Sequence, residues 1–73
     1  MIEKIIAPLS GKVISIHIEP GTQVEEDDEI LVIEAMKMET TVYAPCAGRV
    51  AEVPVKVGAD VEEDDALVLI ETA

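Results

Sequence analysis

The 73-residue sequence has almost no aromatic side chains, since it holds one tyrosine and neither phenylalanine nor tryptophan. Its core must therefore be aliphatic, and stacking of bases on aromatic rings is excluded as a binding mode. The single cysteine, Cys46, excludes an internal disulfide, and one cysteine with one histidine is too small a set for a zinc site. We expect Cys46 to pack rather than react, and we expect no metal site.

Basic residues are scarce as well. Five lysines and arginines stand against 16 aspartates and glutamates, which gives a net charge of −11. The electrostatic field of such a negative charge repels phosphate backbones and anionic lipid head groups. The sequence also lacks an apolar run of about 18 residues and the layout of a signal peptide. These absences predict a cytoplasmic protein with no nucleic-acid partner and no direct membrane contact.

The chain is short for a protein with its own active site. A domain of this size buries only about 60% of the surface that its unfolded chain exposes, so nearly every apolar residue must enter one thin core. We expect a single domain over residues 1–73 that is not an enzyme by itself.

An internal repeat organises the sequence. A shift of 37 positions aligns residues 2–36 with residues 39–73, and 12 of these 35 pairs are identical. Since neither half could bury its own apolar face, we expect the two halves to pack about an approximate twofold axis. The clearest matches are Ala7–Val13 with Ala44–Val50, Val24–Asp28 with Val61–Asp65, and Ile33–Glu34 with Ile70–Glu71.

Four segments are predicted to be strands. Lys12–Ile18 and Arg49–Val55 alternate with period two, while Ile30–Ile33 and Leu67–Ile70 are apolar runs too short for buried helices. Regularly spaced prolines and glycines between them are typical of an all-β sandwich or small barrel. The predicted core consists of Val13, Ile16 or Ile18, Ile30, Val32, Val50, Val53 or Val55, Leu67 and Leu69.

Other polar and reactive residues have simple structural interpretations. We expect His17 to be an exposed strand residue and Tyr43 to lie at the edge of the core. The acidic runs Glu25–Glu29 and Glu62–Asp65 recur at equivalent positions without the spacing of oxygen ligands, which favours solvated turns over cation sites.

The connection between the two halves is the most informative segment. A tight hairpin between a strand ending at Glu34 and one beginning near Met38 places Met36 and Lys37 at the centre of the turn. Two-residue hairpins usually recruit Asn-Gly or Asp-Gly, because their backbone needs positive φ. Lys37 is also the symmetry equivalent of the place where the chain ends meet. We therefore expect Lys37 at one end of the molecule and both termini at the other.

Two interpretations of this turn remain open. A lysine at a hairpin tip is most often a solvated charge, whereas the strained turn favours a lysine displayed for a partner. Met36 and Met38 could be core residues at the edge of the hairpin, or exposed polarizable surface that an enzyme recognises.

The segment Glu34–Glu39, with Ala-Met-Lys-Met at its centre, resembles the attachment site of the biotinyl domains, which belong to the biotinyl/lipoyl domain family. The resemblance covers essentially the whole chain. It implies a flattened barrel or sandwich of the hammerhead type, with two four-stranded antiparallel sheets and an exposed hairpin at Lys37. Two departures stand out: Asp27–Asp28 replaces a frequent glycine-aspartate pair, and Ile18–Val24 matches its repeat without the insertion that forms a thumb in some relatives.

The resemblance implies a biotin carboxyl carrier and not an enzyme. Lys37 would carry covalently attached biotin and shuttle a carboxyl group between biotin carboxylase and carboxyltransferase or decarboxylase active sites. Ala35, Met36 and Met38 would be the flanking recognition residues for a biotin protein ligase. The isolated domain is expected to be monomeric.

Two alternatives have the same fold. A lipoyl carrier of a 2-oxo acid dehydrogenase resembles this chain, but such domains have Asp-Lys-Ala at the turn where this chain has Met36-Lys37-Met38. An unmodified adaptor domain would leave Lys37 free.

Overall fold

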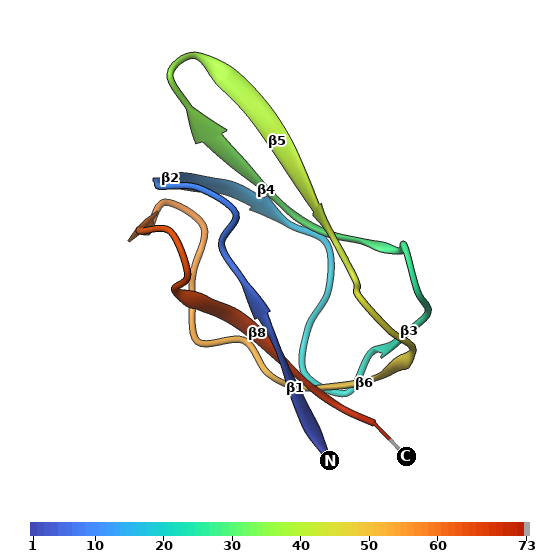
Figure 1. Cartoon of the computed structure of the whole chain (residues 1–73). Coiled ribbons are helices and arrows are strands. Elements are labelled where there is room, and N and C mark those ends of the chain that lie inside the picture. Colours follow the sequence, from blue (N-terminus) through green and yellow to red (C-terminus); the bar gives the residue numbers. More distant parts are fainter. Residues whose placement is uncertain (73) are drawn as a thin grey trace.

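The computed structural model describes residues 1–72, which form eight β-strands and no helix (Figure 1). Ala73, where the second predicted repeat ends, lies outside the described residues. Within the described chain, no helix is long and apolar enough to cross a membrane. The strands are β1 (Ile2–Ile6), β2 (Gly11–Ile16), β3 (Gln23–Val24), β4 (Glu29–Ala35), β5 (Met38–Tyr43), β6 (Gly48–Glu52), β7 (Asp60–Val61) and β8 (Ala66–Glu71).

The strands form two antiparallel four-stranded sheets whose orders are β1-β8-β6-β3 and β5-β4-β2-β7. A shift of 37 residues converts the first order into the second, strand by strand, so the sequence repeat is also a structural repeat. This confirms the predicted all-β architecture. The sheets do not close into a barrel, because β1 and β5 are edge strands that pair only with β8 and β4, respectively. The fold is a flattened sandwich.

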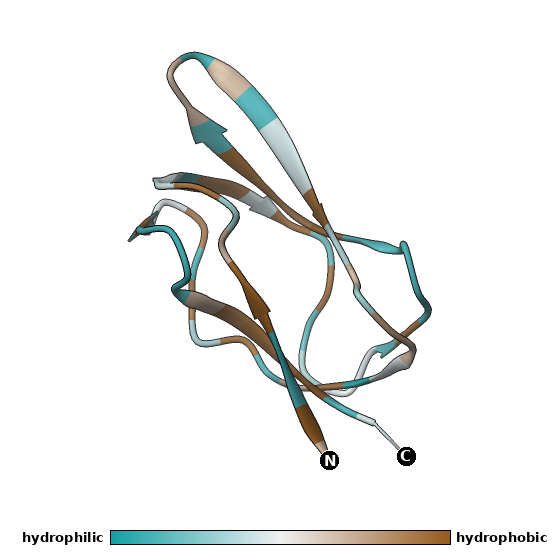
Figure 2. Cartoon of the chain, in the orientation of Figure 1, coloured by the Kyte–Doolittle hydropathy of each residue, from teal (hydrophilic) through white to brown (hydrophobic). Residues whose placement is uncertain are grey.

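The core lies between the two sheets and is entirely aliphatic, with no buried polar or charged residue among those described. Val13, Val50, Ile30 and Leu67 are buried, as predicted. Apolar residues lie along the strands and also in parts of the loops (Figure 2), where Ile18, Val53 and Val55 pack against the core. The remaining buried residues are Ile5, Ala7, Val24, Leu31, Ile33, Val42, Ala44, Val61, Val68 and Ile70, with Ile16, Ile18, Val53 and Val55 packed against them.

The prediction that Val32 and Leu69 belong to the core is wrong, since both are only half-buried and lie outside the core cluster. The register of β4 against β5 shifts between Glu29 and Leu31, and the equivalent shift occurs in β8 against β1. These irregularities place two consecutive residues of each strand in the core and then reverse the alternation.

Each acidic loop is a tight turn in which one aspartate has a left-handed backbone conformation and the next accepts a backbone hydrogen bond. Asp27 and Asp64 have φ angles of 72° and 73°, a region that aspartate tolerates better than most residues. One residue later, the Oδ2 of Asp28 accepts a 2.8 Å hydrogen bond from the Glu25 backbone N–H. Its repeat equivalent Asp65 accepts the same bond from Glu62, also at 2.8 Å. The replacement of glycine by aspartate therefore preserves the turn.

The two ends of the long axis have different roles. The Thr72 N–H donates a 2.7 Å hydrogen bond to the Met1 carbonyl oxygen, which holds the two termini together. Their repeat equivalents are Ala35 and Met38, the pair that closes the Lys37 turn. Figure 1 shows the β4–β5 hairpin at one end of the molecule and both termini at the other, as predicted.

Candidate functional site

The β4–β5 hairpin ends in a two-residue turn. Ala35 pairs with Met38, which leaves Met36 and Lys37 at the turn centre. Their φ angles are 52° and 66°, so both residues adopt the left-handed conformation of a type I′ turn. For residues other than glycine, asparagine or aspartate, this conformation costs on the order of 1 kcal/mol each. The predicted turn is confirmed, and so is its strain.

The base of the hairpin is held firmly by the sheet. Leu31 and Ile33 are fully buried on β4, while β2 pairs with the other side of the same strand. The approach is close: a Cβ atom placed on Gly11 would lie 2.5 Å from the Glu34 carbonyl oxygen and 2.7 Å from Cγ2 of Ile33. The strands therefore fix the direction of the hairpin, and only its last residues project into solvent.

The side chains at the tip are open to solvent. Met36 is 94% exposed and Met38 is 70% exposed, so the interpretation of these methionines as core residues is wrong. Lys37 is exposed, and in the described part of the chain its side chain forms no hydrogen bond. The tip thus presents a primary amine between two apolar, polarizable side chains.

The residues just below the tip carry negative charge. Glu34 and Glu39 are exposed and directly opposite each other in the register of β4 and β5. Like charges in such a pair repel each other. The equivalent pair in the other sheet is Glu71 with Ile2, which has no such repulsion. The fold of the sandwich therefore does not require a glutamate at position 39.

The other residues considered from the sequence do not join the tip. His17 is exposed just beyond β2, with its Nε2 3.5 Å from Oγ of Ser15. Cys46 is a half-buried free thiol in the turn before β6, which agrees with a packing role. Tyr43 is 52% exposed on the edge strand β5. Among residues 1–72, no group of three histidine, cysteine, aspartate or glutamate side chains is arranged to hold a metal ion.

The chemistry available at the tip is that of a nucleophilic amine. Glu34 and Glu39 lie within three residues of Lys37, but in the described part of the chain neither forms a hydrogen bond with it. An exposed primary amine of this kind can form an amide bond with an activated acyl group. Lys4, Lys12 and Lys56 are also exposed, but none of them lies in a projecting turn. The turn, not exposure, distinguishes Lys37.

Comparisons with known proteins find curated relatives that match about half of this chain. The glutaconyl-CoA decarboxylase gamma subunit of Acidaminococcus fermentans is 44% identical over 36 residues, which are 49% of this chain and 25% of that subunit. The mitochondrial methylcrotonoyl-CoA carboxylase alpha subunit of Glycine max is 47% identical over 38 residues, which are 52% of this chain and 5% of that subunit. The matched regions thus make up a quarter or less of these relatives.

Solved structures share the whole fold. A single-chain, multi-domain long-chain acyl-CoA carboxylase matches 99% of this chain with a TM-score of 0.88 and 32% identity, over 7% of its own length. The urea carboxylase of Kluyveromyces lactis matches 97% of this chain with a TM-score of 0.90 and 31% identity, over 6% of its length. In both, a domain like this one is a small part of a much longer chain.

A family model described as "Biotin-requiring enzyme" matches residues 3–70, which include both sheets and the Lys37 hairpin. Biotin is the cofactor of this family. The chain belongs to the family of biotin-requiring enzymes and has the fold of their biotinyl domains.

Proposed function

We propose that this chain is a biotin carboxyl carrier in which Lys37 is the attachment residue. The carrying observation is the geometry of the tip: a lysine in a left-handed turn, between two exposed methionines, at the end of the sandwich opposite the termini. The family match indicates that the group such an amine would carry is biotin. When bound, biotin supplies a ureido nitrogen that accepts and releases a carboxyl group.

Attachment would be catalysed by a biotin protein ligase. The neutral Nζ of Lys37 attacks the acyl carbon of biotinyl-adenylate in the ligase. A carbon–nitrogen bond forms, the bond from that carbon to the phosphate oxygen breaks, AMP leaves and the nitrogen loses a proton. Because no side chain in residues 1–72 forms a hydrogen bond with Lys37, we expect a group of the ligase to accept this proton. Ala35, Met36 and Met38 are the surface that the ligase would recognise.

The shape of the domain suits carriage between two active sites. The molecule measures 36 Å along its longest axis and 18 by 17 Å across. A narrow end that carries the lysine can enter an active-site opening, while the termini at the opposite end are free to be tethered. Tethering raises the effective concentration of the carried group at the second site. We propose biotin carboxylase as one partner, and a carboxyltransferase or decarboxylase as the other.

The decisive experiment is intact-mass analysis of Lys37→Arg after incubation with a biotin protein ligase, biotin and ATP. The wild-type chain should gain one biotinyl group, whereas Lys37→Arg should fold normally and gain none. Lys56→Arg is the matched control, because Lys56 is also an exposed loop lysine. Biotin on Lys37→Arg would refute the assignment of the attachment residue.

A further inference from the structure

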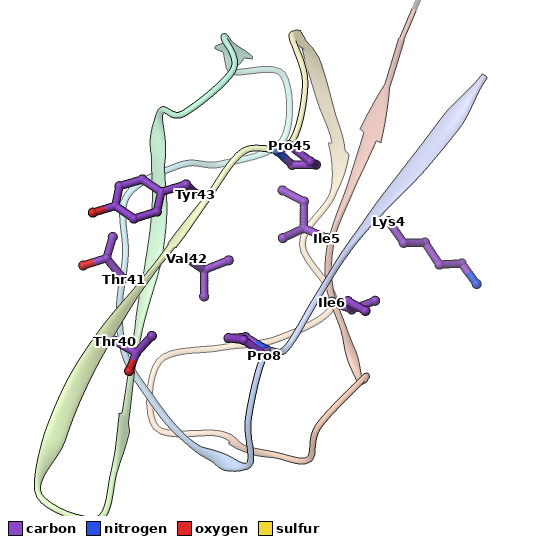
Figure 3. Close-up of a pocket in the computed structure, with 9 residues that line it drawn as sticks. All are labelled: Lys4, Ile5, Ile6, Pro8, Thr40, Thr41, Val42, Tyr43 and Pro45. Atoms are coloured by element: carbon purple, nitrogen blue, oxygen red, sulfur yellow. The ribbon is translucent and has the colours of Figure 1, made fainter.

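A groove of about 430 Å³ lies between β1 and β5, the edge strands of the two sheets (Figure 3). Ile5 and Val42, which are repeat equivalents, point toward each other between the strands and form its floor. Another equivalent pair, Pro8 and Pro45, marks its two ends. The groove therefore lies across the approximate twofold axis of the sandwich.

The lining of this groove is uncharged. No carboxylate contributes to it, although the chain has 16 acidic residues, and its lysine, Lys4, points away from it (Figure 3). Tyr43 also points away. What faces the opening is aliphatic surface with the hydroxyl of Thr40 at one end. Such a groove suits a neutral, mainly apolar group that carries a few hydrogen-bonding atoms.

One end of the groove is continuous with the Lys37 tip. Alternation along β5 places Met38, Thr40 and Val42 on the same face of the strand. Met38 is 70% exposed, because the hairpin projects beyond the sandwich. An open strip thus runs from Met38 past Thr40 to the groove floor.

The two ends of the groove differ in their distance from the tip. Pro8 precedes Gly11, which packs against Glu34 at the base of the hairpin, so the Pro8 end lies below the tip. Pro45 precedes Gly48, which packs against Ile70 and Glu71 near the termini. The Pro45 end therefore faces away from Lys37.

A group on Lys37 can reach the near end. Thr40 is three residues along β5 from Lys37, a distance of about 10 Å for an extended strand. The lysine side chain and the valeryl chain of biotin together contain roughly ten bonds and span about 13 Å when extended, from standard bond lengths. The arm is long enough for the bicyclic ring to arrive between Thr40 and Pro8.

We propose that the biotinyl ring on Lys37 rests in the Pro8 end of this groove when no partner enzyme holds it. This inference depends on the proposed function, since it requires biotin on Lys37. The thioether side of the ring is apolar and matches the aliphatic floor, and the ureido group can hydrogen-bond to Thr40 or to the free edges of β1 and β5. A partner enzyme must then draw the ring out of the groove before it can use it.

The test compares the apo and biotinylated forms of the 73-residue chain by nuclear magnetic resonance. We expect chemical-shift changes and nuclear Overhauser contacts from ring protons to methyl groups of Ile5, Thr40 and Val42. Changes confined to residues 35–39 would overturn the resting site and leave the carrier function intact. Failure of Lys37 to accept biotin at all would instead refute the proposed function.

A matched pair of variants makes the test sharper. Pro8→Glu places a charge at the near end, and Pro45→Glu places the same charge at the equivalent far end. In the biotinylated proteins, Pro8→Glu should abolish the ring contacts and speed capture by streptavidin, about twofold if the ring is docked half of the time, because only the free fraction is captured. Pro45→Glu should change neither measurement.

Equal capture rates in the wild type and both variants, with no ring contacts in the wild type, would overturn the proposal. If Pro8→Glu does not fold, Thr40→Glu serves in its place, since Thr40 lines the groove at the end nearest the tip.

Discussion

At the scale of single residues, the chain contains two kinds of left-handed turn that use no glycine. Asp27 and Asp64 have positive φ, but each lies in a loop where the next aspartate accepts a backbone hydrogen bond. Met36 and Lys37 have positive φ without any such bond and without burial. Only the strand pairing of Ala35 with Met38 holds the second turn in this conformation, which fits the proposed display of Lys37 to a partner.

The methionines should determine which ligase accepts the domain. Biotin and lipoate ligases meet similar sandwiches with a similar lysine, so selection must depend on the few side chains beside it. We expect Met36→Asp combined with Met38→Ala to lower the rate of biotinylation about tenfold, which corresponds to a loss of about 1.4 kcal/mol. The measurement is competitive modification by the two ligases, followed by intact mass. Glu63→Gln, in an exposed acidic turn, should have no effect, and preferential lipoylation of the wild type would contradict the biotin assignment.

The strain at the acidic turns should appear in stability. Alanine tolerates positive φ less well than aspartate, so Asp27→Ala and Asp64→Ala should each reduce the free energy of unfolding by about 1 kcal/mol. The two losses should be similar, because the φ angles are 72° and 73°. Urea denaturation measures both, with Asp27→Asn as the control that retains tolerance of the left-handed region. An Asp27→Ala variant as stable as the wild type would show that the turn can adopt another backbone conformation.

At the scale of elements, the repeat and the periodicity of the sequence predict where the central strands lie, although β2 ends at Ile16 rather than Ile18 and β6 at Glu52 rather than Val55. The apolar runs 30–33 and 67–70 lie within β4 and β8, and the hairpin at Lys37 is correct. The repeat also contained the signal for β1, since a strand beginning near Met38 implies an equivalent one near Met1, but β1 was not predicted. The core positions Val32 and Leu69 were wrong because register irregularities depend on pairing between distant strands.

The groove could not be predicted either. It forms between edge strands of different sheets, and no local pattern reports the distance between two sheets. The Lys37 turn, in contrast, is local: its length, its residues and its place at the centre of the repeat are all visible in the sequence. Local conformation was thus predictable, and contacts between distant segments were not.

Gly11 and Gly48, where neighbouring strands approach each other closely, should not tolerate a side chain. A Cβ atom on Gly48 would lie 2.5 Å from Cγ2 of Ile70 and 2.7 Å from the Glu71 carbonyl oxygen, much as at Gly11. We expect Gly11→Ala and Gly48→Ala to lower the free energy of unfolding by about 1–3 kcal/mol each, as overpacking does. Ala47→Ser, which adds an atom at the exposed neighbouring position, should cost little. Wild-type midpoints in urea for both glycine variants would mean that the paired strands can separate locally.

At the scale of the whole molecule, the twofold repeat gives the domain two equivalent ends, and the chain uses them differently. One end closes with the Met36-Lys37 turn, while the other is left open where Met1 and Thr72 meet. The sandwich itself does not require either choice, because the strand pairs at both ends are equivalent. The two ends therefore differ because the Met36-Lys37 turn joins the strands at only one of them.

This equivalence predicts that the domain can be circularly permuted. Joining Thr72 to Met1 through Asn-Gly, in place of Ala73, should build a second two-residue turn, because Thr72 and Met1 already pair as Ala35 and Met38 do. New termini can be placed between Lys56 and Val57, which are both exposed. The permuted chain should unfold within a few degrees of the wild type in a thermal scan followed by circular dichroism. It should still accept biotin at Lys37, since the β4–β5 hairpin is unchanged.

A permutant with Asn-Gly that folds no better than one with a long flexible glycine-serine linker would show that the two ends are not equivalent. The domain would then depend on an open strand pair at Met1 and Thr72.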